Sequence, residues 1–482
     1  MGRERNPGQP PGSRPGWIGR VRILAGLTCV ALLVLPAAAA AQDEPGPDKN
    51  GITPPSIATS LPYNGDPTGL RAWLAGKGLT YNLIYTNDVL SNLHGGARSG
   101  TVDQGKLEYN MTFDFEKLTG WHGLTFYTNV FVIHNNGRFR RDIVGGVNTI
   151  AAIEADGTAR LSELWLEQTF WNDKASLRVG QLAADVQFFY TALSTPFLQS
   201  DWPTITALNL PSGGPAYPLS TPGARLKIEP TKDISILFAI FNGDPAGPPP
   251  PDDEQVRNPH GLNFRLRDPP FLLTETQVFA NHGKDDTGLA RGMKLGAWGH
   301  LGRFDDQRFA NDGTLLADPA GSGDPLKRFG NFGIYGVFEQ QLYRPAGGAW
   351  DSGISVFSRI SASPSDRNPV NFYVDGGIVF SGMIPGRPDD KFGASFMLAR
   401  FSDALRAFDR DRIAFTGLPG LVHDFEANLE INYTFQVIPG WIFQPIFTYV
   451  WNPSGEGSIA AAANGEIIRN ATVVGFRSMW SY

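Results

Sequence analysis

The sequence predicts an all-β protein, a transmembrane antiparallel barrel of roughly sixteen to eighteen strands with a short N-terminal helical segment. Three observations lead to this prediction. Apolar and polar residues alternate along many segments, Gly/Pro/Asp-rich segments separate them, and an apolar export leader precedes them. Because side chains alternate between the two faces of a strand, such segments have one apolar and one polar face. Strict alternation is typical of half-buried strands and not of helices.

The first 41 residues have the features of a cleaved signal peptide. Five arginines, an uncharged apolar run from Ile23 to Ala41 and a cluster of alanines correspond to its basic, apolar and cleavage regions. We therefore expect cleavage before Gln42. A membrane-anchoring helix is the alternative, because the run approaches the ~20 residues that span a bilayer. Residues 42–69 are predicted to be a flexible polar lead-in, and residues 70–482 a single barrel domain.

Composition narrows the possible partners. The only cysteine, Cys29, lies in the leader, so the exported chain must rely on a large core or a closed hydrogen-bonded sheet instead of disulfides. The leader contains five arginines and one glutamate, so its removal changes the formal charge from −6 to −10. This charge argues against nucleic acid or anionic lipid as the main partner. No run of ~18 apolar residues follows the leader, which excludes helical membrane spans.

The clearest strand pair lies in residues 158–189, with a polar turn at 171–175. On its first strand Leu164, Leu166 and Phe170 share an apolar face, and on its second strand Leu177 and Val179 do so. The opposite face carries Glu163, Trp165, Glu167 and Thr169, followed by Ser176, Arg178 and Gly180.

The same alternation recurs along the chain, at residues 79–89, 107–115, 124–132, 427–437 and 474–482. Residues 70–75 are predicted to form a short helix that ends at Gly76 and Gly78. Long loops are expected at residues 210–223, 242–261, 304–326, 361–370 and 452–465. Short turns at one end and long loops at the other are typical of outer-membrane barrels.

A closed barrel also gives the backbone N–H and C=O groups their hydrogen-bond partners. In a bilayer every N–H and C=O group needs a partner within the protein, so a sheet can span only if it closes on itself. Polar side chains on nearly every strand then line a water-filled lumen, whereas a soluble sandwich packs apolar residues between its sheets. Aromatic residues near the strand ends fit the aromatic girdles of such barrels, and the chain ends on an aromatic residue, Tyr482.

Several longer stretches resemble the carbohydrate-selective porin family of bacterial outer membranes (OprB-type), from about Gly69 to Tyr482. They are ELWLEQTF (163–170), RVGQLAAD (178–185), LPSGGPAYPL (210–219), FNGDPAGP (241–248), KLGAWGHLGRFDDQRF (294–309), PSDRN (364–368) and PGRPDD (385–390). The resemblance implies a sixteen-stranded barrel in the bacterial outer membrane, whose lumen passes small sugars by diffusion. Its partners would then be small sugars and outer-membrane lipid. The oligomeric state, a homotrimer or a monomer, stays open.

A sugar offers hydroxyl groups for hydrogen bonds and apolar C–H faces for stacking, so a sugar-passing constriction should combine charged groups with aromatic rings. Binding there must be weak, because a tightly bound solute would not leave. We predict that the pore lining includes Glu163, Trp165, Glu167 and Arg178 on one hairpin. Further candidates on other strands are Asp88, Glu108, Asp114, Arg225 and Glu430. Each of these groups could instead only hydrate the wall or pair with a neighbour.

The sequence contains none of the common catalytic motifs G-x-S-x-G, H-E-x-x-H or the P-loop, and its seven histidines lack metal-ligand spacing. We therefore expect no enzyme activity, no cofactor and no metal. The acidic segments 302–309 and 385–390 could bind calcium, although loop salt bridges explain them as well. Two alternatives to a sugar porin stay open: a general or cation-preferring porin, and a secreted soluble β-rich carbohydrate-binding protein.

Overall fold

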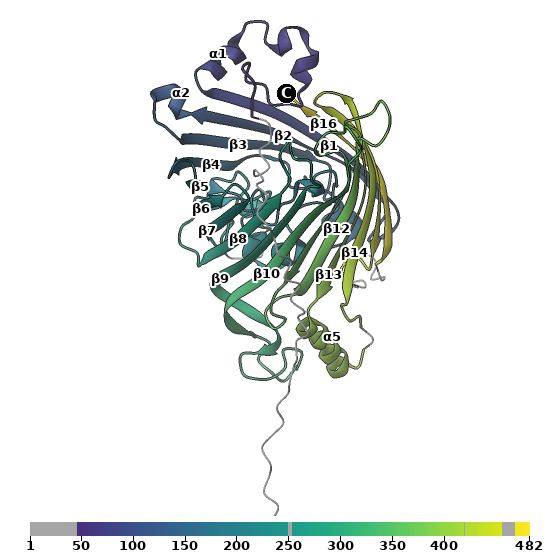
Figure 1. Cartoon of the computed structure of the whole chain (residues 1–482). Coiled ribbons are helices and arrows are strands. Elements are labelled where there is room, and N and C mark those ends of the chain that lie inside the picture. The colour runs from purple at the N-terminus through teal and green to yellow at the C-terminus, as the bar shows by residue number, and fades with distance from the viewer. Residues whose placement is uncertain (1–45, 249–252, 419, 456–467) are drawn as a thin grey trace, which may run out of the picture. The chain divides into compact units, whose positions relative to one another are not determined.

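The computed structural model describes residues 46–248, 253–418, 420–455 and 468–482. Within them, sixteen strands form one closed barrel (Figure 1). Each strand pairs antiparallel with its neighbours in the sequence, and β1 pairs with β16 to close the sheet. The barrel confirms the predicted fold class. The predicted signal peptide, residues 1–41, lies outside the described residues.

The strands follow one another around the barrel in chain order. They are β1 (Leu79–Gly96), β2 (Gly100–Asp114), β3 (Leu124–Asn135), β4 (Thr158–Phe170), β5 (Ala175–Leu182), β6 (Thr221–Thr231), β7 (Ile234–Asn242), β8 (Pro270–Ala280), β9 (Arg291–Ala310), β10 (Pro325–Tyr343), β11 (Gly353–Ala362), β12 (Val370–Ser381), β13 (Lys391–Phe401), β14 (Phe425–Ile438), β15 (Trp441–Trp451) and β16 (Arg469–Ser481).

Helices are short and lie between the strands or before them. The α-helices are α1 (Leu70–Gly76), α2 (Phe115–Thr119), α3 (Thr204–Asn209), α4 (Glu254–Arg257) and α5 (Asp403–Thr416). Other helical turns are η1 (Ile57–Ser60), η2 (Pro62–Gly65), η3 (Phe139–Val144), η4 (Ala192–Ser194) and η5 (Pro211–Gly213). No helix in the described part of the chain is long and apolar enough to cross a membrane.

The hairpin β4–β5 has the predicted division of faces. Leu166 and Val179 are 47% and 49% exposed on the outside, whereas Glu163 and Trp165 are 6% and 8% exposed inside. Pairing between β3 and β4 shifts by one residue here, so that Ser162 and Glu163, although adjacent in sequence, are both buried. A bulge of this kind re-aims side chains in a way that strict alternation does not predict.

The two ends of the barrel differ in their connections. At one end lie α1, α2, the C-terminus and short turns such as 171–174 and 232–233 (Figure 1). At the other end lie α5 and the longer loops. We call these the turn end and the loop end; in outer-membrane barrels in general, the end with short turns faces the periplasm.

One predicted loop is shorter than expected. The sequence predicts a loop over residues 304–326, but β9 continues to Ala310 and β10 begins at Pro325. Lys327 pairs in register with Asp305, and these opposite charges form an ion pair across the two strands. Opposite charges in facing positions stabilise a strand pair, so a charged segment can extend a hairpin beyond the membrane.

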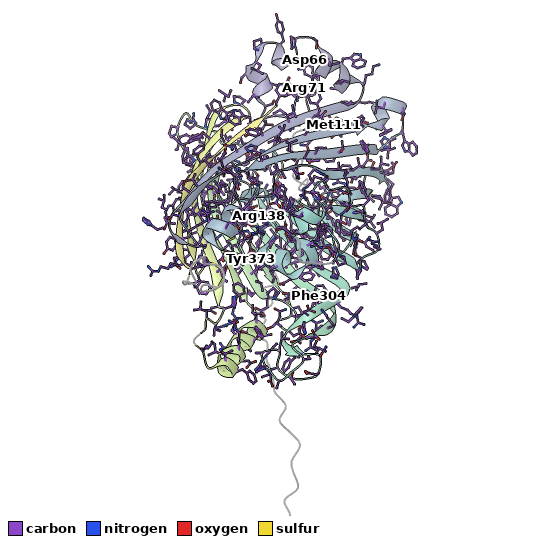
Figure 2. The ribbon with its side chains drawn as sticks, turned by 180° about the vertical axis from the view of Figure 1, so that it is seen from behind. Asp66, Arg71, Met111, Arg138, Phe304 and Tyr373 are labelled. Atoms are coloured by element: carbon purple, nitrogen blue, oxygen red, sulfur yellow. The ribbon has the colours of Figure 1, made fainter. Side chains whose placement is uncertain are left out.

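The segment before β1 packs against the place where the barrel closes (Figure 2). Arg71 of α1 is 2% exposed and donates hydrogen bonds to the carbonyls of Gly51 and Tyr81, each at 3.2 Å. Its guanidinium lies 4.8 Å from the ring centroid of Tyr482, whose hydroxyl donates to the Gly65 carbonyl at 2.8 Å. The C-terminal aromatic residue therefore joins the first and last strands to the N-terminal segment.

Candidate functional site

Residues 183–220 connect β5 to β6, and we call them the inner loop because they bind the inward faces of strands across the barrel. The carboxylate of Glu430 on β14 accepts hydrogen bonds from the backbone N–H groups of Leu198 and Gln199, each at 3.0 Å. The Phe189 N–H donates to Glu275 on β8 at 3.1 Å. Contacts to strands so far apart hold the loop inside the lumen, where it narrows the passage.

Arg359, an arginine on β11, also anchors the inner loop. Arg359 on β11 is 4% exposed and forms an ion pair with Asp375 on β12. The same guanidinium donates to the carbonyls of Asp201 at 3.0 Å and Phe189 at 3.3 Å. Because Asp375 balances its charge, Arg359 can donate to the loop without remaining a lone buried cation.

The predicted hairpin carries a compact charge cluster on its lumen face. Glu167 accepts hydrogen bonds from Arg178 at 2.7 Å and from Arg225 at 2.8 Å. Arg178 and Arg225 are directly opposite in the β5–β6 register, so the single carboxylate compensates two neighbouring cations. The side chains of Glu167 and Arg178 are 16% and 15% exposed, whereas Arg225 is 4% exposed. Glu167 and Arg178 are therefore the more exposed members of the cluster.

Trp165 supports this cluster. The Arg178 guanidinium lies 3.7 Å from the centroid of the Trp165 ring, and the Tyr127 ring stacks on Trp165 with centroids 4.8 Å apart. With only 8% of Trp165 exposed, little of its ring remains for a sugar to stack on. The indole instead fixes the guanidinium plane through a cation–π contact.

A second charge pair lies on β2, nearer the loop end. Lys106 and Glu108 form an ion pair at 2.9 Å, and their side chains are 16% and 21% exposed. Glu108 also accepts a hydrogen bond from Asn129 on β3 at 2.8 Å. The Lys106 ammonium lies 5.1 Å from the ring centroid of Tyr217 in the inner loop. We use the term polar row for Lys106, Glu108, Glu167, Arg178 and Arg225.

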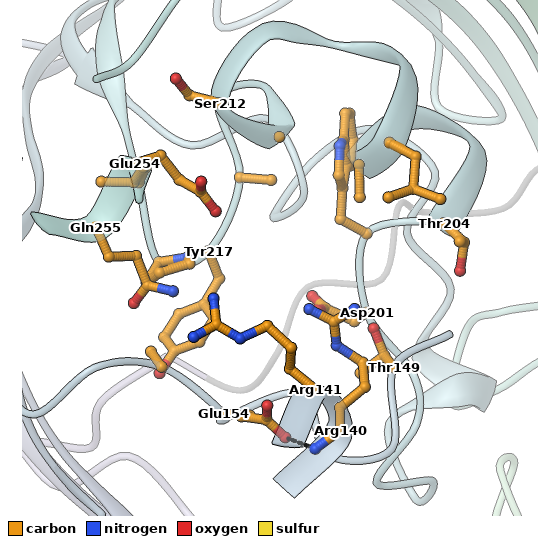
Figure 3. A pocket seen from close by; sticks show the side chains of 18 of the residues that line it. Arg140, Arg141, Thr149, Glu154, Asp201, Thr204, Ser212, Tyr217, Glu254 and Gln255 are labelled. Carbon is orange, nitrogen blue, oxygen red and sulfur yellow. Dashed lines mark hydrogen bonds between the residues drawn. The ribbon is translucent and has the colours of Figure 1, made fainter. Parts of the chain in front are cut away.

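A cavity of about 460 Å³ lies at the loop end of the polar row, and we call it the vestibule (Figure 3). Loop 136–157, the inner loop and residues 253–257 form its walls. Tyr217 lines it, so the vestibule meets the polar row at Lys106. Figure 3 shows Arg141 reaching toward Tyr217, and Glu154 bonded to the backbone of Arg140.

Charges of both signs line the vestibule. Arg138 pairs with Asp156 and Asp253, and Arg141 pairs with Asp253 at 3.0 Å. Burial, with the Asp185 carboxylate nearby, raises the pKa of Asp201 to about 7. The charge of this wall therefore depends on pH near neutrality.

The comparisons with known proteins agree with this geometry. The family model described as carbohydrate-selective porin, OprB family, matches residues 98–482. The chain belongs to this family. It is a porin of the bacterial outer membrane that passes carbohydrates.

Two relatives show the extent of the similarity. Porin B of Pseudomonas aeruginosa is 23% identical over 418 residues, which cover 82% of this chain and 87% of that protein. The high-pH structure of Pseudomonas putida OprB superposes with a TM-score of 0.74 at 20% identity, covering 87% of this chain and 98% of that one. The structural likeness supports the barrel fold.

The other predicted pore residues of the porin have bonds that occupy their side chains. Asp88 is fully buried and forms a two-bond ion pair with Arg477, at 2.7 and 2.8 Å. Glu163 accepts from the Ala183 N–H at 3.3 Å, where the inner loop begins. Asp114 caps α2 at the turn end, and Glu430 anchors the inner loop. These four side chains organise the wall and its connections.

Sequence reasoning missed Lys106 and the inner loop. Lys106 lies two residues before Glu108, so the alternation that selected Glu108 places Lys106 on the same face. Nothing in the alternation selects the inner loop, because its anchors Glu275, Arg359 and Glu430 belong to strands far away in the sequence.

The acidic segments of the porin form ion pairs. Arg308 binds Asp411 of α5 at 2.7 Å, and Arg387 binds Asp390 at 2.8 Å. Within the described residues, no group of three or more His, Cys, Asp or Glu side chains could hold a metal ion. Ion pairs in these two segments involve Asp305, Asp306, Arg308, Arg387 and Asp390.

Proposed function

We propose that small neutral sugars enter the porin through the vestibule and pass along the polar row to the periplasm. The observation that carries this proposal is a row of paired charges on the lumen wall, next to the vestibule on its turn-end side. Carboxylates accept hydrogen bonds from sugar hydroxyls, and guanidinium or ammonium groups donate to them. A sugar can therefore exchange its hydrogen-bond partners step by step as it moves along the row toward the turn end.

The pairing of charges along the row favours uncharged solutes. Lys106 pairs with Glu108, and Arg178 and Arg225 both pair with Glu167. With three cations and two carboxylates, the row offers strong local dipoles but only a small net charge to attract an ion. Weak, repeated contacts of this kind allow a solute to bind and then leave.

The aromatic rings that stack on the sugar would be those of the vestibule. Tyr217 and Trp202 line it, and their rings offer apolar faces for the C–H groups of a sugar. The outward apolar side chains of the strands would contact outer-membrane lipid. Passage along this route is diffusion and needs neither a cofactor nor a catalytic group.

Liposome swelling tests the route. Vesicles that contain the purified porin are diluted into isotonic glucose or into an uncharged solute of equal size without vicinal hydroxyls. Faster swelling with glucose supports sugar preference, and Arg178→Gln should reduce that preference because it replaces a charged guanidinium, with five N–H donors, by a neutral amide with two. Lys117→Gln, a matched loss of charge on the exposed helix α2, serves as the control. Equal swelling in both solutes, or an unchanged preference in Arg178→Gln, would remove the row from the pathway.

A further inference from the structure

A second cavity, of about 130 Å³, lies on the turn-end side of the inner loop, and we call it the exit cavity. Ala192 and Leu193 of the inner loop cover it, while His282 and Trp350 in turn-end connections close its periplasmic side. Its volume exceeds the ~10–15 Å³ that one water molecule needs. The exit cavity lies between strands β9 and β13, away from the polar row on β2 to β6.

Glu339 on β10 lines the exit cavity and is 6% exposed. Neither of its carboxylate oxygens has a hydrogen-bond partner among the described residues. Its register partner on β9 is Gly292, which has no side chain that could reach it. A buried carboxylate needs donors to replace the water it has lost. In the described part of the barrel no protein donor bonds to it, so a molecule in the cavity can supply the missing donors.

His282 presents a second acceptor to the same cavity. Its Nε2 lies 3.0 Å from the Arg291 carbonyl, and because a carbonyl only accepts, Nε2 carries the hydrogen. Nδ1 is then an acceptor, and it is buried without a partner among the described residues. Burial lowers the pKa of His282, which keeps the ring neutral and Nδ1 free to accept.

The remaining lining selects among possible ligands. Lys391 adds an ammonium group to the lining, which opposes a simple cation, and Glu339 opposes an anion. The indole of Trp350 adds an aromatic surface. A polyhydroxylated ring donates to two acceptors, accepts from an ammonium group and has an apolar face, so it fits this lining.

We propose that Glu339 and His282 form a second sugar-binding subsite, at the periplasmic exit of the lumen, with Trp350 as its apolar wall. The subsite rests on the proposed function, since it needs sugars to pass the inner loop. It would bind hydroxyl groups of a sugar as the solute leaves the constriction.

A thiol-protection experiment tests the subsite separately from transport. The described residues contain no cysteine, so Asp351→Cys places a single thiol on the lining of the exit cavity. Its rate of alkylation by a small maleimide is measured in folded porin with increasing glucose. At a glucose concentration of about twice the dissociation constant, the rate should fall about threefold, as mass action requires. Trimethylglycine at equal osmolality is the solute control, and Asp173→Cys in the exposed β4–β5 turn is the position control.

Glu339→Gln in the Asp351→Cys background should remove most of the protection, because it replaces one acceptor with an amide donor. His282→Leu removes the other acceptor and serves as an independent variant if the first folds poorly. Absence of protection while glucose still swells liposomes would overturn the subsite and leave the proposed function intact. Protection that is equal in all three proteins would also overturn it. Loss of swelling by glucose would instead contradict the proposed function.

Discussion

Glu167 lies between two arginines, so removing the carboxylate and removing one arginine should have unequal effects. Glu167→Gln leaves Arg178 and Arg225 facing each other in register without their shared counter-charge. Arg178→Gln keeps the Glu167–Arg225 ion pair intact. We therefore expect the first substitution to destabilise the barrel more than the second.

The structure sets the size of the difference. Breaking a buried ion pair by removing one partner costs about 3–5 kcal/mol. Arg225 is 4% exposed but retains bonds to Gln187 at 2.8 Å and Ser176 at 2.7 Å, so we expect about 3 kcal/mol for Glu167→Gln. Loss of a hydrogen bond to a charged group costs about 1.5 kcal/mol, which we expect for the more exposed Arg178→Gln.

Urea unfolding of the refolded porin in detergent, followed by tryptophan fluorescence at neutral pH, measures both values. The comparison is valid only where the slopes of the two transitions agree with that of the unmodified protein. A cost of Arg178→Gln equal to or above that of Glu167→Gln would refute the view that Glu167 compensates both arginines.

Three further predictions concern the outer face, the inner loop and the vestibule. Leu166→Arg should lower the folded fraction on heat-modifiability gels, because a charge on the lipid face costs ~2–4 kcal/mol at mid-membrane. Leu166→Ile is the control. Normal folding of both variants would contradict contact between Leu166 and lipid. Arg359→Met should raise single-channel conductance, because it releases the inner loop. It should also lower the free energy of unfolding by about 3 kcal/mol, because it leaves Asp375 without its ion-pair partner. Unchanged conductance would argue against Arg359 as an anchor of the inner loop. Raising the pH through 7 ionises Asp201, whose pKa lies at about 7, and adds a negative charge to the vestibule. The cation-to-anion permeability ratio should therefore rise with pH, and rise less in Asp201→Asn; equal slopes in the two proteins would contradict this assignment.

The barrel could be predicted from sequence because one local rule governs its strands. Leu166 and Val179 face outward while Trp165 and Arg178 face the lumen, as a period of two requires. The lumen contents could not be predicted in this way. Glu430 has the same alternation signal as Glu167, but its carboxylate holds the inner loop, since backbone N–H groups more than 200 residues away in sequence reach it.

Local irregularities also limited the prediction. The shift in pairing between β3 and β4 turns both Ser162 and Glu163 inward, although alternation assigns them to opposite faces. Asp114 has the polar alternation of a lumen residue, but β2 ends there and its carboxylate caps α2. In each case the deciding contact is made by a neighbouring element, which the sequence pattern of one strand does not contain.

The most direct test of the sugar pathway is an experimental structure of the porin in a lipid nanodisc with saturating glucose. We expect sugar density within hydrogen-bond distance of Arg178 and Glu167, inside the barrel and on the turn-end side of the vestibule. Glucose found only at the outer surface, with the polar row occupied by water alone, would contradict it.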